Sequence, residues 1–467
     1  MKKLSILIVA MVLTANLSAQ TAPDETQNKI KQLEAQVQTI LVELEKLKKA
    51  SQIPVEAAKV EVPKAIAVAA KQTDSERKPI GIEVGNGIRL IPYGTIYFNA
   101  FGNSGGTNNA DVPIFATPTG SGNVSASVRQ TRLGFRLEGA KVGKAKLTGV
   151  FEGDFFGGFP SISTGENFGL FRVRLAYARL DWEKTTVTVG QDWMVFAPIN
   201  PVSMAAAGNP QLAAAGNNWA RLPQLKIEYK FGGHVTWQAA LLEQQTADFT
   251  STAAFVVQPT SGAASRVPFL QTRIAFSDKN WFGTKKAGSI GLSGHYGRSR
   301  VFTGSTNTRN DIDSDGIALD WNFPISTRIS VLGEAFTGEN LGGFQGGVFQ
   351  SYNNDFARRV GSTLVQGGVK AIKTRGGWVQ IGFTPPVTND RLSIYGSIGI
   401  DDPDNKDLVS VSHRDWRTRN LAIAANANYK FTPNFSVGAE FRRFQTNYFY
   451  SGRPNSNHVN LGASYSF

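Results

Sequence analysis

Apolar and polar residues alternate with a period of two from about residue 86 to the end of the chain. In the segment 131–137 the odd positions carry Thr, Leu, Phe and Leu, and the even positions carry Arg, Gly and Arg. The same alternation recurs in 171–178, 225–231, 420–431 and 458–467. Successive side chains of a strand point to opposite faces, so each segment predicts a strand with one apolar and one wet face.

Very short turns alternate with long polar or glycine-rich loops between these predicted strands. The short turns lie at 141–143, 183–184, 232–233, 279–286, 324–326, 386–389 and 432–433. The long loops lie near 102–123, 157–167, 197–219, 246–266, 302–313, 340–373, 402–415 and 450–457. Strands of soluble sandwiches also alternate, but the regular change between short and long connections is typical of membrane β-barrels.

The connections set the expected number of strands. Eight long loops and seven turns join sixteen strands. The run 364–373 resembles a further strand, but two short connections cannot follow one another. We therefore assign that run to the sixth long loop or to an extension of the strand that contains Trp378. The sequence predicts an all-β fold over residues 82–467, a 16-stranded antiparallel transmembrane β-barrel preceded by a short N-terminal α-helical coiled coil.

The last predicted strand carries the most specific local signal. Apolar residues occupy every second position from Val459 onward, and the last two of them are Tyr465 and Phe467. The final strand of a barrel closes against the first, and aromatic residues are enriched where strands leave the membrane. We expect Tyr465 and Phe467 to form the signal that the barrel-assembly machinery recognises.

The N-terminal residues have the pattern of an export signal. Two lysines precede an apolar run from Leu4 to Leu13, and small residues end at Ala19. This pattern predicts a secretory signal peptide over 1–19, because the run is too short for a spanning helix. Residues 51–81 are rich in Ala, Val, Pro and Lys and are expected to form a linker.

Residues 20–50 have the spacing of a periplasmic coiled coil. Their apolar positions recur in steps of three and four, which is the seam of a heptad repeat. These positions are Ile30, Leu33, Val37, Ile40, Leu44 and Leu47. Three heptads are marginal as an isolated helix, so we expect several copies to be held together, as in a trimer of barrels. A single amphipathic helix lying on a surface is the alternative.

Composition argues against several classes of function. The 467 residues include no cysteine and four scattered histidines without metal spacing, so no thiolate or histidine metal site is expected. His295 shares a face with Ser293, but no acid is placed to orient the pair. The formal charge of +13 is not accompanied by a basic run or a base-stacking motif. We expect no enzyme activity, no cofactor and no nucleic-acid partner.

Basic residues gather on the predicted wet face of strands two to four. They are Arg132, Arg136, Lys146, Arg172 and Arg174, with the lumen acids Glu138, Glu152 and Asp154 nearby. Ion pairs that brace the wall and a ladder that selects anions are equally open interpretations. Beyond residue 82 lie 37 of the 49 basic and 27 of the 36 acidic residues, so we expect a basic lumen that favours anions. The alternation places Leu175 and Tyr177 on the opposite, lipid-facing side.

Two loops carry further candidate residues. The third long loop is rich in alanine and glycine, so it can pack closely against a wall, and we expect a constriction there with Arg221 at its root. A loop lying outside the barrel is the alternative. Asp311, Asp313 and Asp315 resemble the start of a calcium loop, but the twelfth position is Asn322 rather than Glu. An acidic turn that enters the tenth strand is favoured, and no metal is expected.

Several motifs resemble those of the DcaP-like outer-membrane porins, mainly over residues 86–230. They are Arg129-Gln130-Thr131-Arg132-Leu133-Gly134, Glu152-Gly153-Asp154-Phe155-Phe156-Gly157, Phe171-Arg172-Val173-Arg174-Leu175-Ala176-Tyr177, Val189-Gly190-Gln191-Asp192-Trp193 and Gly376-Gly377-Trp378-Val379-Gln380. The resemblance implies a trimer of sixteen-stranded barrels with an N-terminal periplasmic coil, passing dicarboxylates and similar small anions. It assigns the basic constriction to Arg132, Arg172 and Arg174. Asp192 stands where the family more often has Thr, and this extra acid weakens the implied anion preference.

The sequence as a whole favours a passive diffusion porin for small hydrophilic solutes in the bacterial outer membrane. Expected partners are two further copies of the chain, outer-membrane lipid, the barrel-assembly machinery and small anionic solutes. The alternative is an envelope-tethering protein, in which the barrel is an anchor and the coil contacts peptidoglycan. The chain lacks an obvious cell-wall-binding domain, which argues against tethering.

Overall fold

The computed structural model describes residues 81–158, 169–247, 259–303 and 308–467. The predicted signal peptide, the coiled coil and the linker up to residue 80 lie outside the described residues. The described residues all belong to one compact unit. No helix among them is long and apolar enough to cross a membrane.

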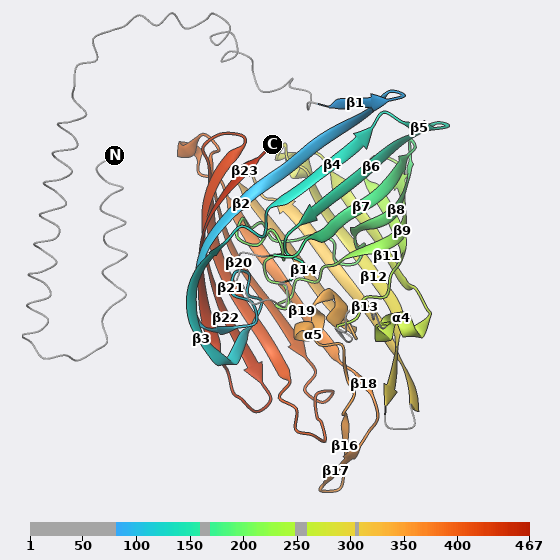
Figure 1. The fold of residues 1–467 in the computed structure, drawn as a ribbon, viewed down its shortest axis with the longest axis vertical. Coiled ribbons are helices and arrows are strands. Elements are labelled where there is room, and N and C mark those ends of the chain that lie inside the picture. Colours follow the sequence, from blue (N-terminus) through green and yellow to red (C-terminus); the bar gives the residue numbers. More distant parts are fainter. Residues whose placement is uncertain (1–80, 159–168, 248–258, 304–307) are drawn as a thin grey trace, which may run out of the picture. The chain divides into compact units, whose positions relative to one another are not determined.

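One antiparallel sheet closes on itself to form a barrel (Figure 1). β3 and β4 are two halves of one wall strand because both pair with β2. Counted in this way, the described residues form sixteen wall strands, as predicted. In chain order they are β2 (Ile88–Thr107), β3 (Ala116–Ser127) with β4 (Arg132–Glu138), β6 (Ala145–Asp154), β7 (Arg172–Asp181), β8 (Thr185–Trp193), β9 (Arg221–Phe231), β10 (Val235–Leu242), β11 (Phe269–Asp278), β12 (Gly288–Thr303), β13 (Thr308–Pro324), β14 (Ile329–Glu339), β19 (Lys373–Phe383), β20 (Leu392–Pro403), β21 (Arg417–Lys430), β22 (Phe435–Tyr448) and β23 (Asn455–Ser466).

Pairing between the first and last wall strands closes the ring. β2 and β23 pair from Thr95 with Ser466 to Asn103 with His458. Beyond this ladder, the amide and carbonyl of Phe467 bond to the carbonyl and amide of Gly94, at 3.1 and 3.2 Å. A closed ring leaves no wall strand with an unpaired edge.

The connections contain the remaining short elements. β1 (Ile82–Gly85) folds back on β2, and β5 (Lys141–Val142) pairs with β6. The others are α4 (Ser261–Ser265), η2 (Trp281–Gly283), η3 (Gly342–Phe344), α5 (Gly346–Phe349), β15 (Tyr352–Asn353), β16 (Ala357–Val360), β17 (Thr363–Gln366), β18 (Lys370–Ala371) and η4 (Pro386–Thr388). We call the end of the barrel with the short connections the turn end, and the opposite end the loop end.

Two of the predicted long loops are shorter than expected. The β12–β13 ladder continues to Thr303 paired with Thr308, so most of the predicted loop 302–313 is strand. Likewise β2 reaches Thr107 and β3 begins at Ala116, inside the predicted loop 102–123. These segments are polar because they extend beyond the apolar band of the wall. The run 364–373 lies in the sixth long connection and the start of β19, as predicted.

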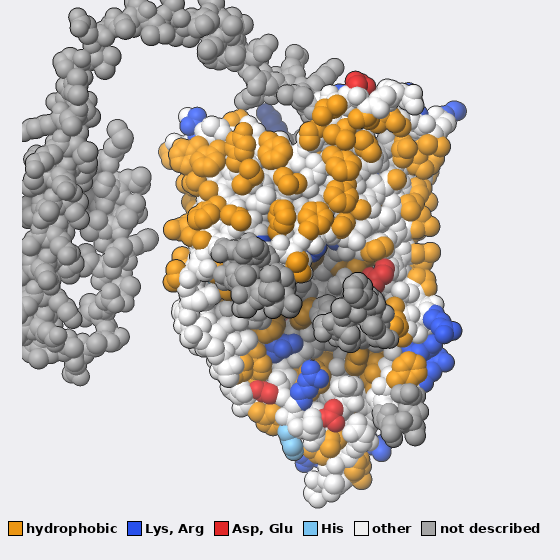
Figure 2. All heavy atoms as spheres, viewed as in Figure 1, with side chains coloured by type: hydrophobic (Ala, Val, Ile, Leu, Met, Phe, Trp, Pro, Cys, Tyr) orange, Lys and Arg blue, Asp and Glu red, His pale blue; other side chains and the backbone are white. Residues whose placement is uncertain are grey.

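The wall carries apolar side chains outside and polar side chains inside. Ile423 of β21 is 46% exposed, whereas its neighbours Asn420 and Asn426 on the other face are almost completely buried. Polar side chains on the inner face of other wall strands are buried in the same way; they are Gln271, Asp320, Glu334 and Gln380. In Figure 2 exposed apolar side chains gather over the turn-end half of the visible face of the barrel. A soluble protein has the opposite distribution, and an apolar band outside a polar interior is the pattern of membrane barrels.

A β-bulge in β7 corrects one prediction. Val173 pairs with Gly153, but Leu175 pairs with Glu152, so the register shifts between them. A bulge adds one residue to one strand and reverses the faces of the residues beyond it. Arg172 and Arg174 keep their predicted inward positions, but Leu175 and Tyr177 also line an internal cavity. The prediction that these two residues face lipid is therefore wrong.

Candidate functional site

The third long connection, residues 194–220, lies inside the barrel rather than outside it. Its backbone amides donate hydrogen bonds to inward-facing side chains on several wall strands. The bonds join Val195 to Gln271 of β11 at 2.9 Å, Ile199 to Glu334 of β14 at 3.1 Å and Val202 to Gln380 of β19 at 2.8 Å. The side chain of Ser203 donates to Glu440 of β22 at 2.5 Å. The loop therefore crosses the lumen and is fixed to the wall at many points.

Small residues allow the loop to touch the wall. Ala213, Ala214 and Ala215 are completely buried. Gly216 has a φ of 99°, and a Cβ there would lie 2.1 Å from the carbonyl oxygen of Gly377 in β19. Only glycine fits such a close approach. The alanine and glycine content that predicted an inward loop thus has a direct steric reason.

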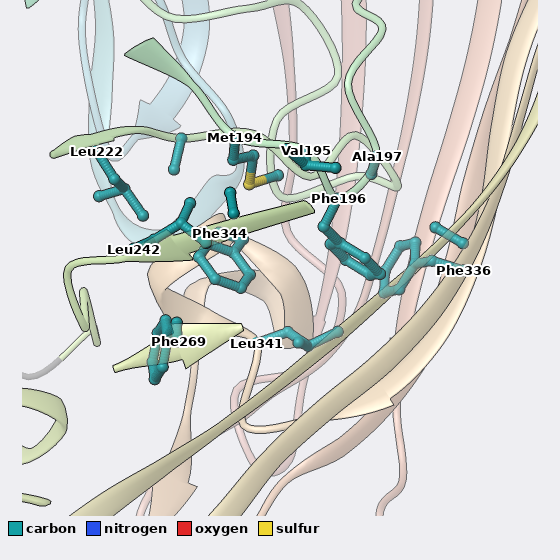
Figure 3. Packing of buried hydrophobic residues seen from close by; sticks show 13 residues of the cluster. Met194, Val195, Phe196, Ala197, Leu222, Leu242, Phe269, Phe336, Leu341 and Phe344 are labelled. Carbon is teal, nitrogen blue, oxygen red and sulfur yellow. The ribbon is translucent and has the colours of Figure 1, made fainter. Parts of the chain in front are cut away.

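The sixth long connection also inserts into the barrel, which the sequence did not predict. Phe344 and Leu341 pack with Phe196 of the third loop and Phe269 of β11 in one buried apolar cluster (Figure 3). A Cβ on Gly343 would lie 2.1 Å from the carbonyl oxygen of Gln245. The glycine pairs at 342–343 and 346–347 are the only signal that could have indicated this close packing.

Arg172 and Arg174 meet two acids beside the third loop. Arg172 binds Asp154 through both Nε and Nη2, at 3.0 and 2.7 Å, and Arg174 binds Glu152 at 2.7 Å and Asp154 at 2.9 Å. Both guanidinium groups also donate to the loop, to the carbonyls of Gly208 and Ala207 at 2.7 and 3.2 Å. The prediction that part of the basic ladder is engaged in ion pairs is consistent with these contacts.

Arg129 was not predicted as a site residue. Its side chain binds Asp111 at 2.7 Å through Nε, and its guanidinium lies 3.8 Å from the ring centre of Phe156. Arg172 lies 5.2 Å from the same ring. Arg129 lies in the short break between β3 and β4, where the alternation that identified the other arginines is interrupted.

Arg221 lies between two tryptophans and has no acidic partner in the described part of the chain. Its guanidinium lies 4.8 Å from the ring centre of Trp193 and 5.1 Å from that of Trp219. It donates a long hydrogen bond of 3.4 Å to the carbonyl of Gly208. Its Nη1 is buried without a hydrogen-bond partner among the described residues. Arg221 thus lies at the root of the inserted loop.

The remaining predicted residues lie toward the turn end. Arg132 donates to the hydroxyl of Tyr97 at 3.0 Å and lies 3.9 Å from Glu152, and Arg136 binds Glu138 at 2.6 Å. Lys146 is exposed at the edge of the barrel beside β5. Arg136 and Glu138 line an internal cavity of about 840 Å³, together with Tyr93, Tyr177 and Arg179.

These residues form one basic site, which we call the arginine cluster. Its members are Arg129, Arg132, Arg172, Arg174 and Arg221 with Asp111, Glu152 and Asp154. Five guanidinium groups face three carboxylates, so the cluster carries excess positive charge. The cavity of the turn end lies on one side of the cluster, and the inserted third loop lies on the other.

The acids that the sequence suggested as a calcium loop or an acidic turn, and the extra acid Asp192, form ion pairs. Asp311 and Asp313 lie in β13 rather than in a turn, and they bind Arg300 at 2.8 Å and Arg298 at 3.0 Å. Neither the calcium loop nor the acidic turn therefore describes them. Asp192 binds Lys226 at 2.5 Å. The described residues contain no group of three or more His, Asp or Glu that could hold a metal ion.

Comparisons with known proteins indicate the same fold. A scan against protein-family models found no match, and a search of curated proteins found none. Among solved structures, the chain is similar to the outer membrane channel DcaP of Acinetobacter baumannii, with 19% identity and a TM-score of 0.61 over 83% of this chain and 99% of that chain. It is also similar to OmpF of Salmonella typhi, with 13% identity and a TM-score of 0.50 over 83% of this chain and all of that chain. The chain therefore shares its fold with these two structures, and the first of them is the kind of channel that the sequence motifs resemble.

Proposed function

We propose that this chain is an outer-membrane porin, a passive diffusion channel for small hydrophilic solutes with a preference for anions. The observation that carries the proposal is the inserted third loop inside a wall that is apolar outside and polar inside. A barrel that served only as an anchor would not need a loop bonded to strands across its lumen. This argument favours the porin over the envelope-tethering alternative.

The arginine cluster supports the anion preference. Rings or clusters of positive charge at a narrow point of a pore favour anions. Arg172 and Arg174 are held by acids and position the third loop, whereas Arg221 has no acidic partner among the described residues. We therefore assign selection mainly to Arg221, and secondly to Arg132, which contacts Tyr97 and Glu152. Dicarboxylates are the permeants that the family resemblance implies.

Assembly completes the proposal. The N-terminal coil predicted over residues 20–50 would lie in the periplasm and hold three barrels together, since an isolated helix of this length is marginal. Tyr465 and Phe467 are both about half exposed, so an assembly factor and later the membrane interface can reach them.

A planar-bilayer measurement tests the proposal. The purified full-length protein, reconstituted in a KCl gradient, should give a reversal potential of the sign set by chloride. A potential of the opposite sign would refute the anion preference, and the absence of conductance would refute the porin itself. Residues 20–81, used to pull down peptidoglycan sacculi, test the tethering alternative.

A further inference from the structure

A small polar cavity lies at the loop end, between the sixth and seventh long connections. Its volume is about 200 Å³. The main side chains around it are those of Gln350, Tyr352, Asn354, Arg414, Trp416 and Arg417. Phe349 also lines it and packs against the cluster that contains Ala213 and Ala214 of the third loop. The cavity is therefore next to the inserted loop but separate from the arginine cluster.

A rigid tryptophan holds one arginine at this cavity. Trp416 is 3% exposed and packs with Ile372 and Leu408. The guanidinium of Arg414 lies 3.9 Å from the ring centre of Trp416, so a cation–π contact fixes its position. The Nε1 of Trp416 has no hydrogen-bond partner in the described residues.

The second arginine is fixed by backbone groups. Arg417 donates to the carbonyl of Val348 at 2.9 Å and to that of Phe349 at 3.4 Å. Its guanidinium lies 4.5 Å from the ring centre of Phe115. These contacts hold the group in place without neutralising its charge.

Acids lie near the cavity but do not pair directly with these two cations. Neither Arg414 nor Arg417 forms a salt bridge within the described parts of the chain. Asp355 accepts a hydrogen bond from the amide of Ser412 at 2.7 Å, and Asp415 accepts one from the amide of Tyr450 at 2.7 Å. Burial lowers the pKa of Arg414, although Asp355 acts in the opposite direction. Two fixed guanidinium groups in a polar cavity, without a salt bridge among the described residues, are suited to a carboxylate or phosphate.

We propose that this cavity is an outer binding site for small free oxyanions, carboxylates above all, which captures them at the loop end before they reach the arginine cluster. The inference rests on the proposed function for its role in transport, but the binding itself does not depend on conduction. A cavity of about 200 Å³ has room for a short dicarboxylate and for little more.

Calorimetric titration of the detergent-solubilised full chain with succinate tests the site. We expect Arg414→Gln to weaken succinate binding at least tenfold and Arg414→Lys to retain part of it, because lysine keeps the charge but loses the planar pair of donors. Inorganic phosphate should compete with succinate, and neutral succinamide should not bind. Arg359→Gln is the matched control, since Arg359 is an exposed arginine on β16 outside the cavity.

The outcomes separate the site from the proposed function. Equal succinate binding by the wild type and Arg414→Gln, or no binding of succinate or phosphate by the wild type, would overturn the site. A cation-selective channel whose Arg414→Gln variant still loses succinate binding would retain the site and remove the anion preference. An anion-selective channel whose Arg414→Gln variant binds succinate as the wild type does would retain the anion preference and overturn the site.

Discussion

Two indole rings and no carboxylate surround Arg221 among the described residues, and this sets it apart from the other inward arginines. The faces of Trp193 and Trp219 attract the guanidinium, but an aromatic ring has no net charge that could cancel it. Arg172 and Arg174, by contrast, bind Asp154 and Glu152 closely. The positive potential of the lumen should therefore depend on Arg221 more than on its neighbours.

Replacing Arg221 by glutamine tests this difference. A unit charge about 4 Å from a permeating ion contributes roughly 1 kcal/mol even in bulk water. Loss of this charge disfavours the anion and favours the cation by that amount, so the ratio of anion to cation permeability should fall roughly thirtyfold. Reversal potentials in planar bilayers give the ratio. Arg359→Gln removes the same charge from exposed strand β16 and should leave the ratio nearly unchanged. Equal effects of the two variants would mean that overall charge, and not the position of Arg221, sets the selectivity.

Replacing Gly94 by valine should weaken the closure of the barrel. A Cβ on Gly94 would lie 2.7 Å from the ring of Phe467 and 2.9 Å from the carbonyl oxygen of Arg132. Such overpacking typically costs about 1–3 kcal/mol, and here it acts where the first and last strands meet. Unfolding of the detergent-solubilised barrel in urea, followed by gel mobility, measures the loss.

Gly396 offers the matched control for this experiment. A Cβ on Gly396 of β20 meets no atom within 4 Å, so Gly396→Val adds the same side chain to a wall strand without a clash. Its urea midpoint should stay close to that of the wild type. If Gly94→Val proves as stable as Gly396→Val, contact between Gly94 and Phe467 does not contribute to closure.

Single residues could be predicted where the alternation of the strand continues and not where it breaks. The inward positions of Arg132 and Arg172 followed from their parity. The bulge beside Glu152 reversed the faces of Leu175 and Tyr177. The sequence contains no marker for the bulge, because the residues at odd and at even positions beyond it could each face either lipid or the lumen. Arg129 was missed for a related reason, since it lies between β3 and β4.

At the scale of elements, the third loop is the part most closely tied to the proposed channel. It uses amides at its start to bind the wall, and it uses the carbonyls of Ala207 and Gly208 to accept bonds from Arg174 and Arg172. Gln130 contacts the same segment, donating to Ala205 and accepting from the amide of Gly208. A loop held on both sides of the lumen reduces the open cross-section.

Deleting residues 205–215 should therefore raise the single-channel conductance. The deletion removes the part of the loop that contacts both Gln130 and the buried Glu440, while the wall strands keep their backbone pairing. A second variant, Gly216→Val, keeps the loop length but places a Cβ 2.1 Å from a carbonyl oxygen of β19, so it should displace the loop and also raise conductance. Unchanged conductance in both variants would show that this loop does not limit flow.

The number and order of elements could be predicted better than their ends. The alternation of short and long connections predicted sixteen strands, because successive connections of an antiparallel barrel must lie at opposite ends. The β12–β13 ladder was underestimated because its last residues, including Arg300 and Asp311, are charged. The insertion of the sixth connection could not be predicted, since Phe344 lies in a buried cluster with residues of the third loop and of several wall strands, and such contacts leave no periodic pattern.

At the scale of the whole molecule, selection by charge should weaken as salt screens it. The Debye length falls from about 10 Å at 0.1 M to about 3 Å at 1 M ionic strength. The permeability ratio of anions to cations should therefore approach one between these two KCl concentrations, whereas the total conductance should rise. A ratio that stayed constant would indicate selection by the geometry of a binding site at close contact.

Thr95 and Ser466 bond across the closing ladder although 371 residues separate them. Bringing such distant segments together is entropically costly and slow compared with forming neighbouring hairpins. Before that step the open sheet has two unpaired edges, which can pair with strands of another chain. Biogenesis of the barrel should hence depend on a chaperone that covers both strand edges until they pair. Without that chaperone, a high concentration of newly made chains should give strand-paired aggregates instead of pores.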